Sequence, residues 1–471
     1  MDVLPYPGVV TKLPGNAFWH GFADMGAVAG HDFVLATGDG CYVVDEAGNR
    51  YLDSTAGLWF CNIGHGRREL AEAAAKQMSD LASYSTFGDF ATRPLIDLAD
   101  RISALAPAED TKVFFTSGGS DSVETAVKMS RRYWVLTGKP DKQMIITRNH
   151  SYHGMHMAGT SIAGIPANRD GYGPMFTEVR NIAWDDAEDL ARAIDEVGAE
   201  NVAAFLCEPV IGAGGVYIAP EGYLSRVREI CRERGVHFIA DEVICGFGRT
   251  GEMFASGRWN LDPDMLLVAK GMTSGYLPMG AVLAAGRIAE PFWSTPGQAW
   301  RHGYTYSGHA TSAAVALVNL DILESEKLVQ AVADKQVMFS ASLAPLRDHS
   351  FVIDVRAGVG LLGAVQLDPA LLAEDPTIGP RLVRAVRDKG VITRLLADGG
   401  LQVSPPFTIT RDDLRLLVTA VDESLTELGS QRVARSRSNV DLLPEQTRDD
   451  SGGFESLEAR LLADVPPHHG G

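Results

Sequence analysis

The chain carries, at residues 238–275, the sequence FIADEVICGFGRTGEMFASGRWNLDPDMLLVAKGMTSG, which contains two short apolar runs that end in charged side chains. The first run, Phe238–Ala240, predicts a buried strand that ends at Asp241. The second run, Met265–Ala269, predicts another buried strand that ends at Lys270. Because open α/β sheets bind ligands beyond the carboxyl ends of their strands, the two strands could bring this acid and this amine into one crevice.

A lysine and an aspartate at neighbouring strand ends suit the chemistry of one cofactor. A lysine amine condenses with an aldehyde to form a Schiff base, and pyridoxal phosphate is held in this way. The pyridine nitrogen of that cofactor must stay protonated to withdraw electrons from the substrate, and a neighbouring carboxylate retains the proton. Lys270 and Asp241 meet these two requirements, although a surface acid and a surface lysine would have the same sequence pattern.

The motifs around these two residues resemble those of a known family. The run D-E-V-x-x-G-F-G-R-T-G at 241–251, with P-D at 263–264 and A-K-G at 269–271, is similar to the signature of class III (ω-type) pyridoxal-phosphate aminotransferases. The resemblance covers roughly residues 30 to 430. It implies an α/β protein of fold type I, with a large lobe on a mostly parallel sheet, a small α+β lobe, and pyridoxal 5′-phosphate as cofactor.

The composition excludes several function classes. With 471 residues, of which 45% are hydrophobic, the chain can bury a large core and form more than one lobe. A net charge of −18 argues against a nucleic-acid binder, which needs clustered Lys and Arg. Because there is neither a membrane-length apolar run nor a signal peptide pattern, we expect a cytoplasmic protein with no membrane partner. The five cysteines are scattered, so neither disulfides nor a metal site are predicted.

A phosphate-binding turn is predicted where the strand expected at 112–116 gives way to a helix. Backbone N–H groups of Gly119 and Ser120 could bind an anion there, and the helix dipole favours negative charge, although the same turn could be a plain helix cap. The resembled family usually has S-G-S-E-A at this point. Gly118, Asp121 and Ser122 are departures from it, so a hydroxyl contact at position 118 is lost.

Four further residues are candidates for the cofactor site. The resemblance implies that the ring of Tyr152 stacks on the cofactor, that Val243 lies against the opposite face, and that Glu208 lies near the 3′-hydroxyl side. Tyr152 is therefore counted, with Lys270, among the catalytic residues. His153 is a secondary acid–base candidate because histidine titrates near neutral pH, but a loop histidine is more often structural.

The substrate pocket implied by the resemblance is apolar and aromatic. Trp59 stands in an A-G-L-W context that lines the pocket in the family, and Phe87 could also face it, although either ring could instead be core. The resemblance gives Arg394 the place of an arginine that binds a carboxylate and can swing away. A guanidinium can bind a carboxylate through two parallel hydrogen bonds. The alternative is that Arg394 is a surface or structural arginine.

These features predict a transaminase that moves an amino group from a primary amine, a diamine or an ω-amino acid to a keto acid by a ping-pong mechanism. The pocket resembles that of the amine:pyruvate branch and favours pyruvate as acceptor, with 2-oxoglutarate as the alternative. An aminomutase or a decarboxylase of the same fold would share Lys270 and Asp241. A non-catalytic relative would have no physical need to keep Lys270, Asp241 and Tyr152 together.

The resemblance also predicts the organisation of the chain and its assembly. Four segments are expected: an N-terminal arm and small-lobe segment at 1–60, a large cofactor-binding domain at 61–326, a small domain at 327–430 and a polar tail at 431–471. The run H-G-x-T-x-S-G-H at 302–309 resembles the family segment whose threonine, here Thr305, reaches the phosphate of the neighbouring subunit's cofactor. This implies a homodimer or a tetramer.

Overall fold

A computed structural model describes residues 15–294 and 296–440. The chain divides at Thr426, and the sheets and the site described below belong to the part that precedes this residue. The predicted arm lies partly outside the described residues, as does most of the predicted tail. Residues 431–440 of that tail continue the helix α15 (Arg411–Val440) beyond the boundary predicted at residue 430. Gly429 does not end the helix, and no proline follows it before Val440 that would force an end.

The largest sheet has seven strands in the order β4-β12-β11-β10-β7-β5-β6. These strands are β4 (Lys112–Thr116), β5 (Met144–Arg148), β6 (Val179–Ile182), β7 (Val202–Cys207), β10 (His237–Asp241), β11 (Met265–Val268) and β12 (Gly280–Ala284). All neighbouring pairs are parallel except those of β12, which runs antiparallel to β11 and β4. The prediction of a mostly parallel sheet is therefore confirmed.

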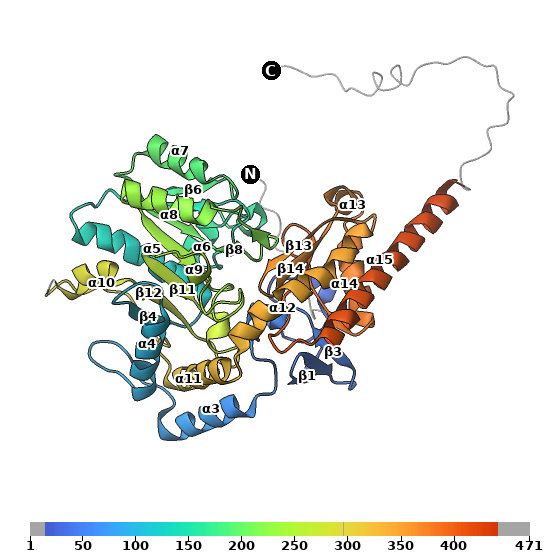
Figure 1. The fold of residues 1–471 in the computed structure, drawn as a ribbon, viewed down its shortest axis with the longest axis horizontal. Coiled ribbons are helices and arrows are strands. Elements are labelled where there is room, and N and C mark those ends of the chain that lie inside the picture. The colour runs from blue at the N-terminus through green and yellow to red at the C-terminus, as the bar shows by residue number, and fades with distance from the viewer. Residues whose placement is uncertain (1–14, 295, 441–471) are drawn as a thin grey trace, which may run out of the picture. The chain divides into compact units, whose positions relative to one another are not determined.

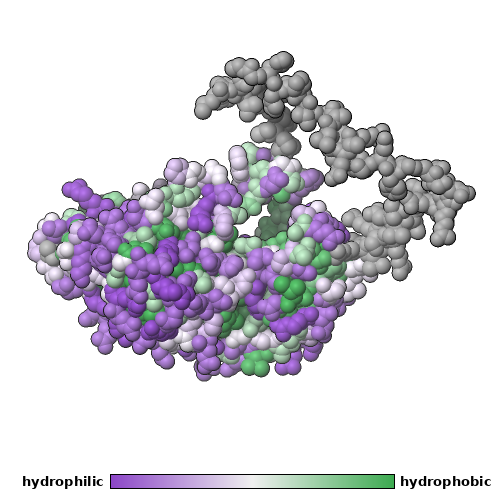
Figure 2. All heavy atoms as spheres, turned by 90° about the horizontal axis from the view of Figure 1, so that it is seen from above, coloured by the Kyte–Doolittle hydropathy of each residue, from purple (hydrophilic) through white to green (hydrophobic). Residues whose placement is uncertain are grey.

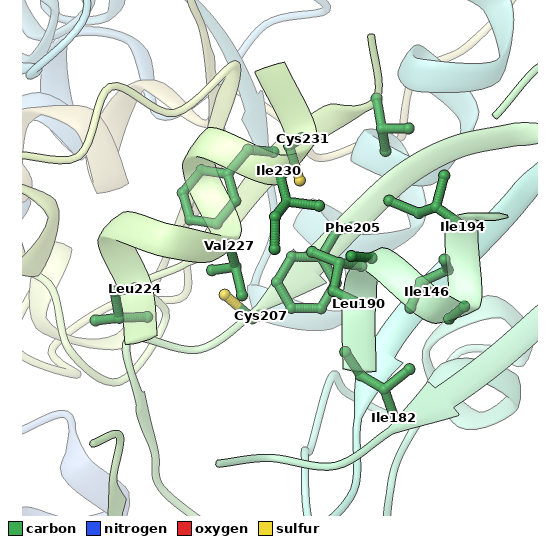
Figure 3. Packing of buried hydrophobic residues seen from close by; sticks show 14 of the residues in the cluster. Ile146, Ile182, Leu190, Ile194, Phe205, Cys207, Leu224, Val227, Ile230 and Cys231 are labelled. Carbon is green, nitrogen blue, oxygen red and sulfur yellow. The ribbon is translucent and has the colours of Figure 1, made fainter. Parts of the chain in front are cut away.

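Both faces of this sheet are covered by helices, as a parallel sheet requires. Side chains alternate along the strands, so Phe205 and Phe238 point to one face and Leu206 and Ile239 to the other. The first face packs against α7 (Ala187–Val197) and α8 (Tyr223–Arg234), as Figure 3 shows for the apolar cluster between them. The second packs against α5 (Gly119–Leu136). This packing fixes the strand ends that carry the polar side chains of the site.

The remaining sheets are smaller and join distant parts of the sequence (Figure 1). One contains β1 (Leu35–Asp39), β2 (Tyr42–Asp45), β3 (Arg50–Asp53) and β15 (Val391–Ile392); another contains β13 (Val352–Val359), β14 (Leu362–Leu367) and β16 (Gly400–Val403); the last pairs β8 (Val210–Ile211) with β9 (Tyr217–Ile218). The antiparallel strands β2 and β3 form a hairpin around Gly48. The parallel pairing of β3 with β15 brings the N-terminal strands against the C-terminal part of the chain.

The other helices surround these sheets. They are α1 (Met25–Val28), α2 (Ala56–Trp59), α3 (Arg68–Leu81), α4 (Arg93–Leu105), α6 (Met157–Ile162), α9 (Ala255–Arg258), α10 (Gly286–Trp293), α11 (Ala310–Ser325), α12 (Leu328–Leu343), α13 (Pro369–Glu374) and α14 (Ile378–Asp388). Hydrophilic side chains dominate the face seen in Figure 2. None of the helices in the described part of the chain is long and apolar enough to cross a membrane. A cytoplasmic location stays a prediction.

His237, the first residue of β10, is expected to make the fold sensitive to acid. Its ring is buried, stacks on Trp134 at 4.4 Å between centroids, and lies 2.9 Å from the Ser130 hydroxyl. Burial lowers the pKa of His237 from 6.5 to about 4. Between these two pH values the unfolded chain binds a proton that the folded chain does not, so stability is lost as the pH falls through this window, by up to about 3 kcal/mol.

The His237→Phe variant should lack this contribution, although the loss of the Ser130 contact lowers its stability by the same amount at every pH. We therefore expect the thermal midpoint of the wild type to fall more steeply than that of the variant between pH 7 and pH 4.5, as measured by circular dichroism. Parallel midpoint curves would show that folding does not lower the pKa of His237.

Candidate active site

A cavity of about 390 Å³ lies at the carboxyl ends of the strands of the large sheet. It is lined by residues that follow five different strands: Ser117 to Ser120 after β4, Tyr152 after β5, Glu208 after β7, Asp241 at the end of β10 and Lys270 after β11. The structure thus brings the predicted acid and amine together with the predicted phosphate-binding turn. Val243 and His153, which are also candidates from the sequence, line the same cavity. Phe60 and Ile244 line it too, and the sequence did not place them there.

Lys270 presents a free amine to this cavity. Its side chain makes no hydrogen bond or ion pair with any of the described residues. Burial lowers the pKa of Lys270, an effect that the charges of Asp241 and Glu208 partly oppose. A lowered pKa increases the fraction of neutral amine, which is the form that attacks a carbonyl group.

The backbone at Lys270 is left-handed, with φ of 42°, a conformation that a residue with a side chain seldom adopts. A fully buried asparagine of α11, Asn319, holds the turn that follows. Its side-chain amide donates hydrogen bonds to the carbonyl oxygens of Gly271 (2.9 Å) and Met272 (3.1 Å), and its Oδ1 accepts one from Ser274 Oγ (2.6 Å). These bonds compensate for the strain and fix the direction of the lysine.

Asp241 is buried and is held by two donors. His153 Nδ1 lies 2.8 Å from Asp241 Oδ2, and the backbone N–H of Val243 donates to Oδ1 at 3.1 Å. The other ring nitrogen of His153, Nε2, is buried without a hydrogen-bond partner among the described residues. His153 thus contacts the carboxylate that is predicted to hold the proton of the cofactor. With one ring nitrogen engaged in this way, His153 is not a free acid–base group in the cavity.

Glu208 has a supporting position on the wall of the cavity. Its carboxylate accepts hydrogen bonds from the backbone N–H groups of Tyr152 (2.9 Å) and Gly212 (2.8 Å). Burial raises the pKa of Glu208. The two backbone contacts fix the loop from which the Tyr152 ring enters the cavity.

The turn at 117–120 forms a close-fitting wall at the start of α5. A Cβ atom on Gly119 would lie only 2.8 Å from Val243 Cγ1, so no side chain fits there and the backbone can approach a ligand closely. The space beside Gly118 is open. Ser120 Oγ accepts a hydrogen bond from the backbone N–H of Met155 at 3.1 Å. The free amine, the buried carboxylate, the Tyr152 ring and this glycine-lined helix start fit pyridoxal phosphate.

A second chamber of about 650 Å³ adjoins the first and shares Tyr152, Ile244 and Lys270 with it. Trp59 and Arg394 line this chamber. The guanidinium carbon of Arg394 lies 4.8 Å from the centre of the Trp59 ring, and Arg394 Nε donates to Gln402 Oε1 at 2.7 Å. Trp59 is itself fixed by a hydrogen bond from Nε1 to Ser404 Oγ of 3.1 Å.

Two predicted site residues line neither the cofactor cavity nor the second chamber. Phe87 is exposed and lines a different pocket, where it packs near Gly303. Thr305 is exposed and lines neither the cavity nor the second chamber. The neighbouring Tyr304 hydroxyl donates to the backbone oxygen of Asp121 (3.2 Å), which ties this segment to the first turn of α5. The roles of Phe87 and Thr305 stay predictions.

Comparisons with known proteins identify the family of this chain. The sequence model of the class III aminotransferase family matches residues 25–425. The chain is 38% identical over 423 residues to the putrescine–pyruvate aminotransferase of Pseudomonas aeruginosa, with 85% of this chain and 92% of the relative covered. It is 37% identical over 418 residues to the ω-amino acid–pyruvate aminotransferase of Pseudomonas putida, with 84% and 92% covered.

Solved structures give the same result. A PLP-bound amine transaminase from an uncultivated Pseudomonas species superimposes with a TM-score of 0.83 at 37% identity, with 88% of this chain and 100% of the other covered. The predicted fold type, the aminotransferase activity and the cofactor, pyridoxal 5′-phosphate, are thereby confirmed. The chain belongs to the class III family of pyridoxal-phosphate-dependent aminotransferases.

Proposed function

We propose that this enzyme transfers an amino group from a primary amine, a diamine or an ω-amino acid to a keto acid, with pyruvate favoured over 2-oxoglutarate as acceptor. The observation that carries the proposal is the shared wall of the two chambers, where Lys270 and Tyr152 border both the cofactor cavity and the chamber of Trp59 and Arg394. The similarity to pyruvate-dependent relatives supports the choice of acceptor.

The residues of the cavity divide the catalytic work between them. Pyridoxal phosphate, when bound, supplies an electron sink for the bond that breaks at the substrate Cα. Lys270 Nζ takes the proton from this Cα and later returns a proton as general acid, which its free amine and lowered pKa favour. Asp241 keeps the pyridine nitrogen protonated. Tyr152 and Val243 would hold the cofactor ring, and the backbone N–H groups of Gly119 and Ser120 would bind its phosphate.

Different residues of the second chamber bind the uncharged and the charged groups of the substrates. Trp59 and its apolar neighbours accept an uncharged side chain, whereas Arg394 binds the carboxylate of a keto acid. The Nε atom of Arg394 is occupied by Gln402, so the outer guanidinium nitrogens are the ones free to form a pair of parallel bonds with a carboxylate.

Arg394→Ala is expected to raise the KM for pyruvate by about 100-fold, because a buried pair of charge-assisted hydrogen bonds is lost. Propanal, an acceptor of similar size without a carboxylate, should be affected by less than about 3-fold. Steady-state kinetics with both acceptors measures the split, with Arg347→Ala, an exposed arginine outside both chambers, as control. An equal loss for both acceptors would remove Arg394 from carboxylate binding.

We further propose a homodimer, or a tetramer, in which Thr305 reaches the phosphate of the neighbouring cofactor. Thr305 is exposed, as a residue that contacts a neighbouring subunit must be in the isolated chain. The small lobe is proposed to combine residues 1–60 with 327–430 beside the large domain 61–326, and the β3–β15 pairing supports this division.

The proposal is tested by visible spectroscopy of the purified holoenzyme. A panel of amines is added first, and the loss of the cofactor band identifies the donors. Pyruvate or 2-oxoglutarate is then added to see which one restores the band. If neither keto acid restores the band, two other activities remain. Release of CO2 would favour a decarboxylase, and turnover without an acceptor would favour an aminomutase. A protein that shows no band after incubation with pyridoxal phosphate would not fit any of these activities.

A further inference from the structure

The turn that carries Trp59 has an unusual backbone conformation. Within α2, the residues Ala56, Gly57 and Trp59 have positive φ angles of 47°, 67° and 59°. Only glycine adopts such angles readily, so two of these three residues are strained. A strained backbone persists only where surrounding contacts stabilise it. The direction in which the Trp59 ring enters the second chamber therefore depends on the contacts that hold this turn.

The carboxylate of Asp53, at the end of β3, holds the turn through both of its oxygens. Its Oδ1 accepts hydrogen bonds from the backbone N–H (3.0 Å) and the hydroxyl (2.7 Å) of Thr55. Its Oδ2 accepts one from the backbone N–H of Gly57 (2.7 Å) and one from His65 Nε2 (2.9 Å). Asp53 is buried and lines neither the cofactor cavity nor the second chamber, so it acts on the turn from behind.

Asp53 is ionised at neutral pH, which makes it a strong acceptor. Burial raises the pKa of Asp53, but the hydrogen bonds from His65 and Thr55 outweigh burial, so the pKa lies below its usual value. An ionised carboxylate accepts with both oxygens, whereas an amide in its place would direct an NH2 group at two of the four donors. An asparagine at this position would therefore keep the shape and lose at least one backbone contact of the turn.

The same turn is connected to Arg394. The carbonyl oxygen of Thr55 accepts hydrogen bonds from the backbone N–H of Trp59 (3.0 Å) and from the side-chain amide of Gln402 (3.3 Å). Gln402 Oε1 in turn accepts the hydrogen bond from Arg394 Nε. A chain of hydrogen bonds thus leads from Asp53 through Thr55 to both groups that the proposed function assigns to substrate binding.

We infer that Asp53 is a positioning residue for substrate binding: it holds the turn of α2 so that Trp59 and Arg394 face the second chamber. His65 supports this role by donating to the carboxylate. The inference rests on the proposed function, because it gives a task to a residue that contacts neither substrate nor cofactor. The residues that bond to Asp53 do not line the cofactor cavity. Its effect should therefore appear in the KM values of the substrates and not in cofactor binding.

Steady-state kinetics of Asp53→Asn tests the inference. We expect the KM values for pyruvate and for benzylamine, a primary amine with an apolar ring, to rise by about 10-fold or more, with kcat changed by less than about 3-fold. A purely structural loss would lower the amount of active enzyme, and with it kcat, and leave KM unchanged. Asp45→Asn is the matched control: Asp45 accepts hydrogen bonds from the Asn49 N–H (2.8 Å) and the Tyr51 hydroxyl (3.0 Å), and it lines neither chamber.

Hydrogen exchange of backbone amides shows whether the turn is held, independently of catalysis. Peptides of the holoenzyme that cover residues 54–62 should exchange at least about 10-fold faster in Asp53→Asn than in the wild type, because a backbone N–H of the turn has lost its acceptor. Peptides that cover residues 265–275, around Lys270, should keep the wild-type rate. A residue with a general structural role would change the exchange of both regions.

A double-mutant cycle identifies the side chains through which Asp53 acts. In a Trp59→Ala background, Asp53→Asn should raise the KM for benzylamine by less than about 3-fold, because the ring that Asp53 positions has been removed. In an Arg394→Ala background, the same limit should apply to the KM for pyruvate.

His65 provides variants that leave the carboxylate in place. His65→Ala removes one of the four hydrogen bonds of Asp53 and should raise both KM values by about 3-fold. His65→Gln, whose side-chain amide can donate to the same oxygen, should return them to within about 2-fold of the wild type. This pair of variants tests the inference even if Asp53→Asn does not fold.

The outcomes are distinct. Unchanged KM values in Asp53→Asn, or wild-type exchange at residues 54–62, would overturn the inference while the transaminase function stands. A KM effect of full size in the Trp59→Ala and Arg394→Ala backgrounds would also overturn it, because Asp53 would then act through other residues. A wild-type holoenzyme whose cofactor band is lost with no amine would instead refute the proposed function. In that case the exchange measurement still decides whether Asp53 holds the turn.

Discussion

Lys270→Ala is expected to lower kcat by more than about 10⁴-fold, because it removes both the covalent attachment of the cofactor and the base that moves the substrate proton. No other lysine lines the cavity, so no other amine of the described chain can take over either task. The variant should still bind pyridoxal phosphate through the turn at 117–120 and through Asp241. Its visible spectrum should therefore be that of the noncovalently bound aldehyde.

Lys270→Arg separates the charge of the lysine from its nucleophilicity. A guanidinium keeps the positive charge beside Asp241 and Glu208 but does not lose its proton at ordinary pH, so it can neither attack a carbonyl nor act as a base. We expect this variant to be as inactive as Lys270→Ala, which stopped-flow measurement of the first half reaction would show. Substantial turnover by either variant would mean that Lys270 is not the base.

The strands of the site could be predicted because their sequences are locally informative. Phe238–Ala240 and Met265–Ala269 are continuous apolar runs, as strands buried on both faces must be, and charged side chains follow directly after each run. Since the strands are parallel, their ends meet at one edge of the sheet. The meeting of Asp241 and Lys270 in one cavity follows from these two facts alone.

The residues that orient the lysine and the aspartate could not be predicted in the same way. Asn319 lies in α11, about 50 positions from the turn that it holds, and nothing in the surrounding helical sequence marks it. The sequence around His153 is compatible with an acid–base group or a structural histidine, whereas its contact with Asp241 depends on how β5 and β10 are placed in the sheet. Similarly, the hydrogen bond between Arg394 and Gln402 depends on how strand β16, which contains Gln402, lies beside the segment of Arg394. Local patterns predict elements, but side-chain partners depend on the tertiary fold.

The left-handed backbone at Lys270 is another feature without a sequence signal. Positive φ is usual for glycine, and a lysine at such a position looks like any other lysine that follows a strand. The structure stabilises it through contacts of Gly271, Met272 and Ser274 with Asn319. Strain of this kind is tolerated where the surrounding contacts are sufficient, which is common at catalytic residues.

Asp241→Asn is expected to lower kcat by about 10³-fold or more, through loss of the charge that keeps the pyridine nitrogen protonated. The amide has nearly the same shape, so the hydrogen bond from the Val243 N–H can persist through the amide oxygen. Its NH2 group would face His153 Nδ1, which can adapt by moving its own proton to Nε2. Folding and cofactor content should therefore be preserved, as measured by thermal midpoint and by bound pyridoxal phosphate.

His153→Ala is the matched variant, because it removes the partner of Asp241 and leaves the carboxylate. Groups that orient a functional residue typically contribute about 10-fold to 100-fold, so its effect on kcat should be clearly smaller than that of Asp241→Asn. The isotope effect on removal of the substrate Cα proton should rise in Asp241→Asn, since a weaker electron sink makes that step limiting. If Asp241→Asn kept wild-type kcat, then the proton on the pyridine nitrogen would not depend on this carboxylate, and the role of His153 would be structural alone.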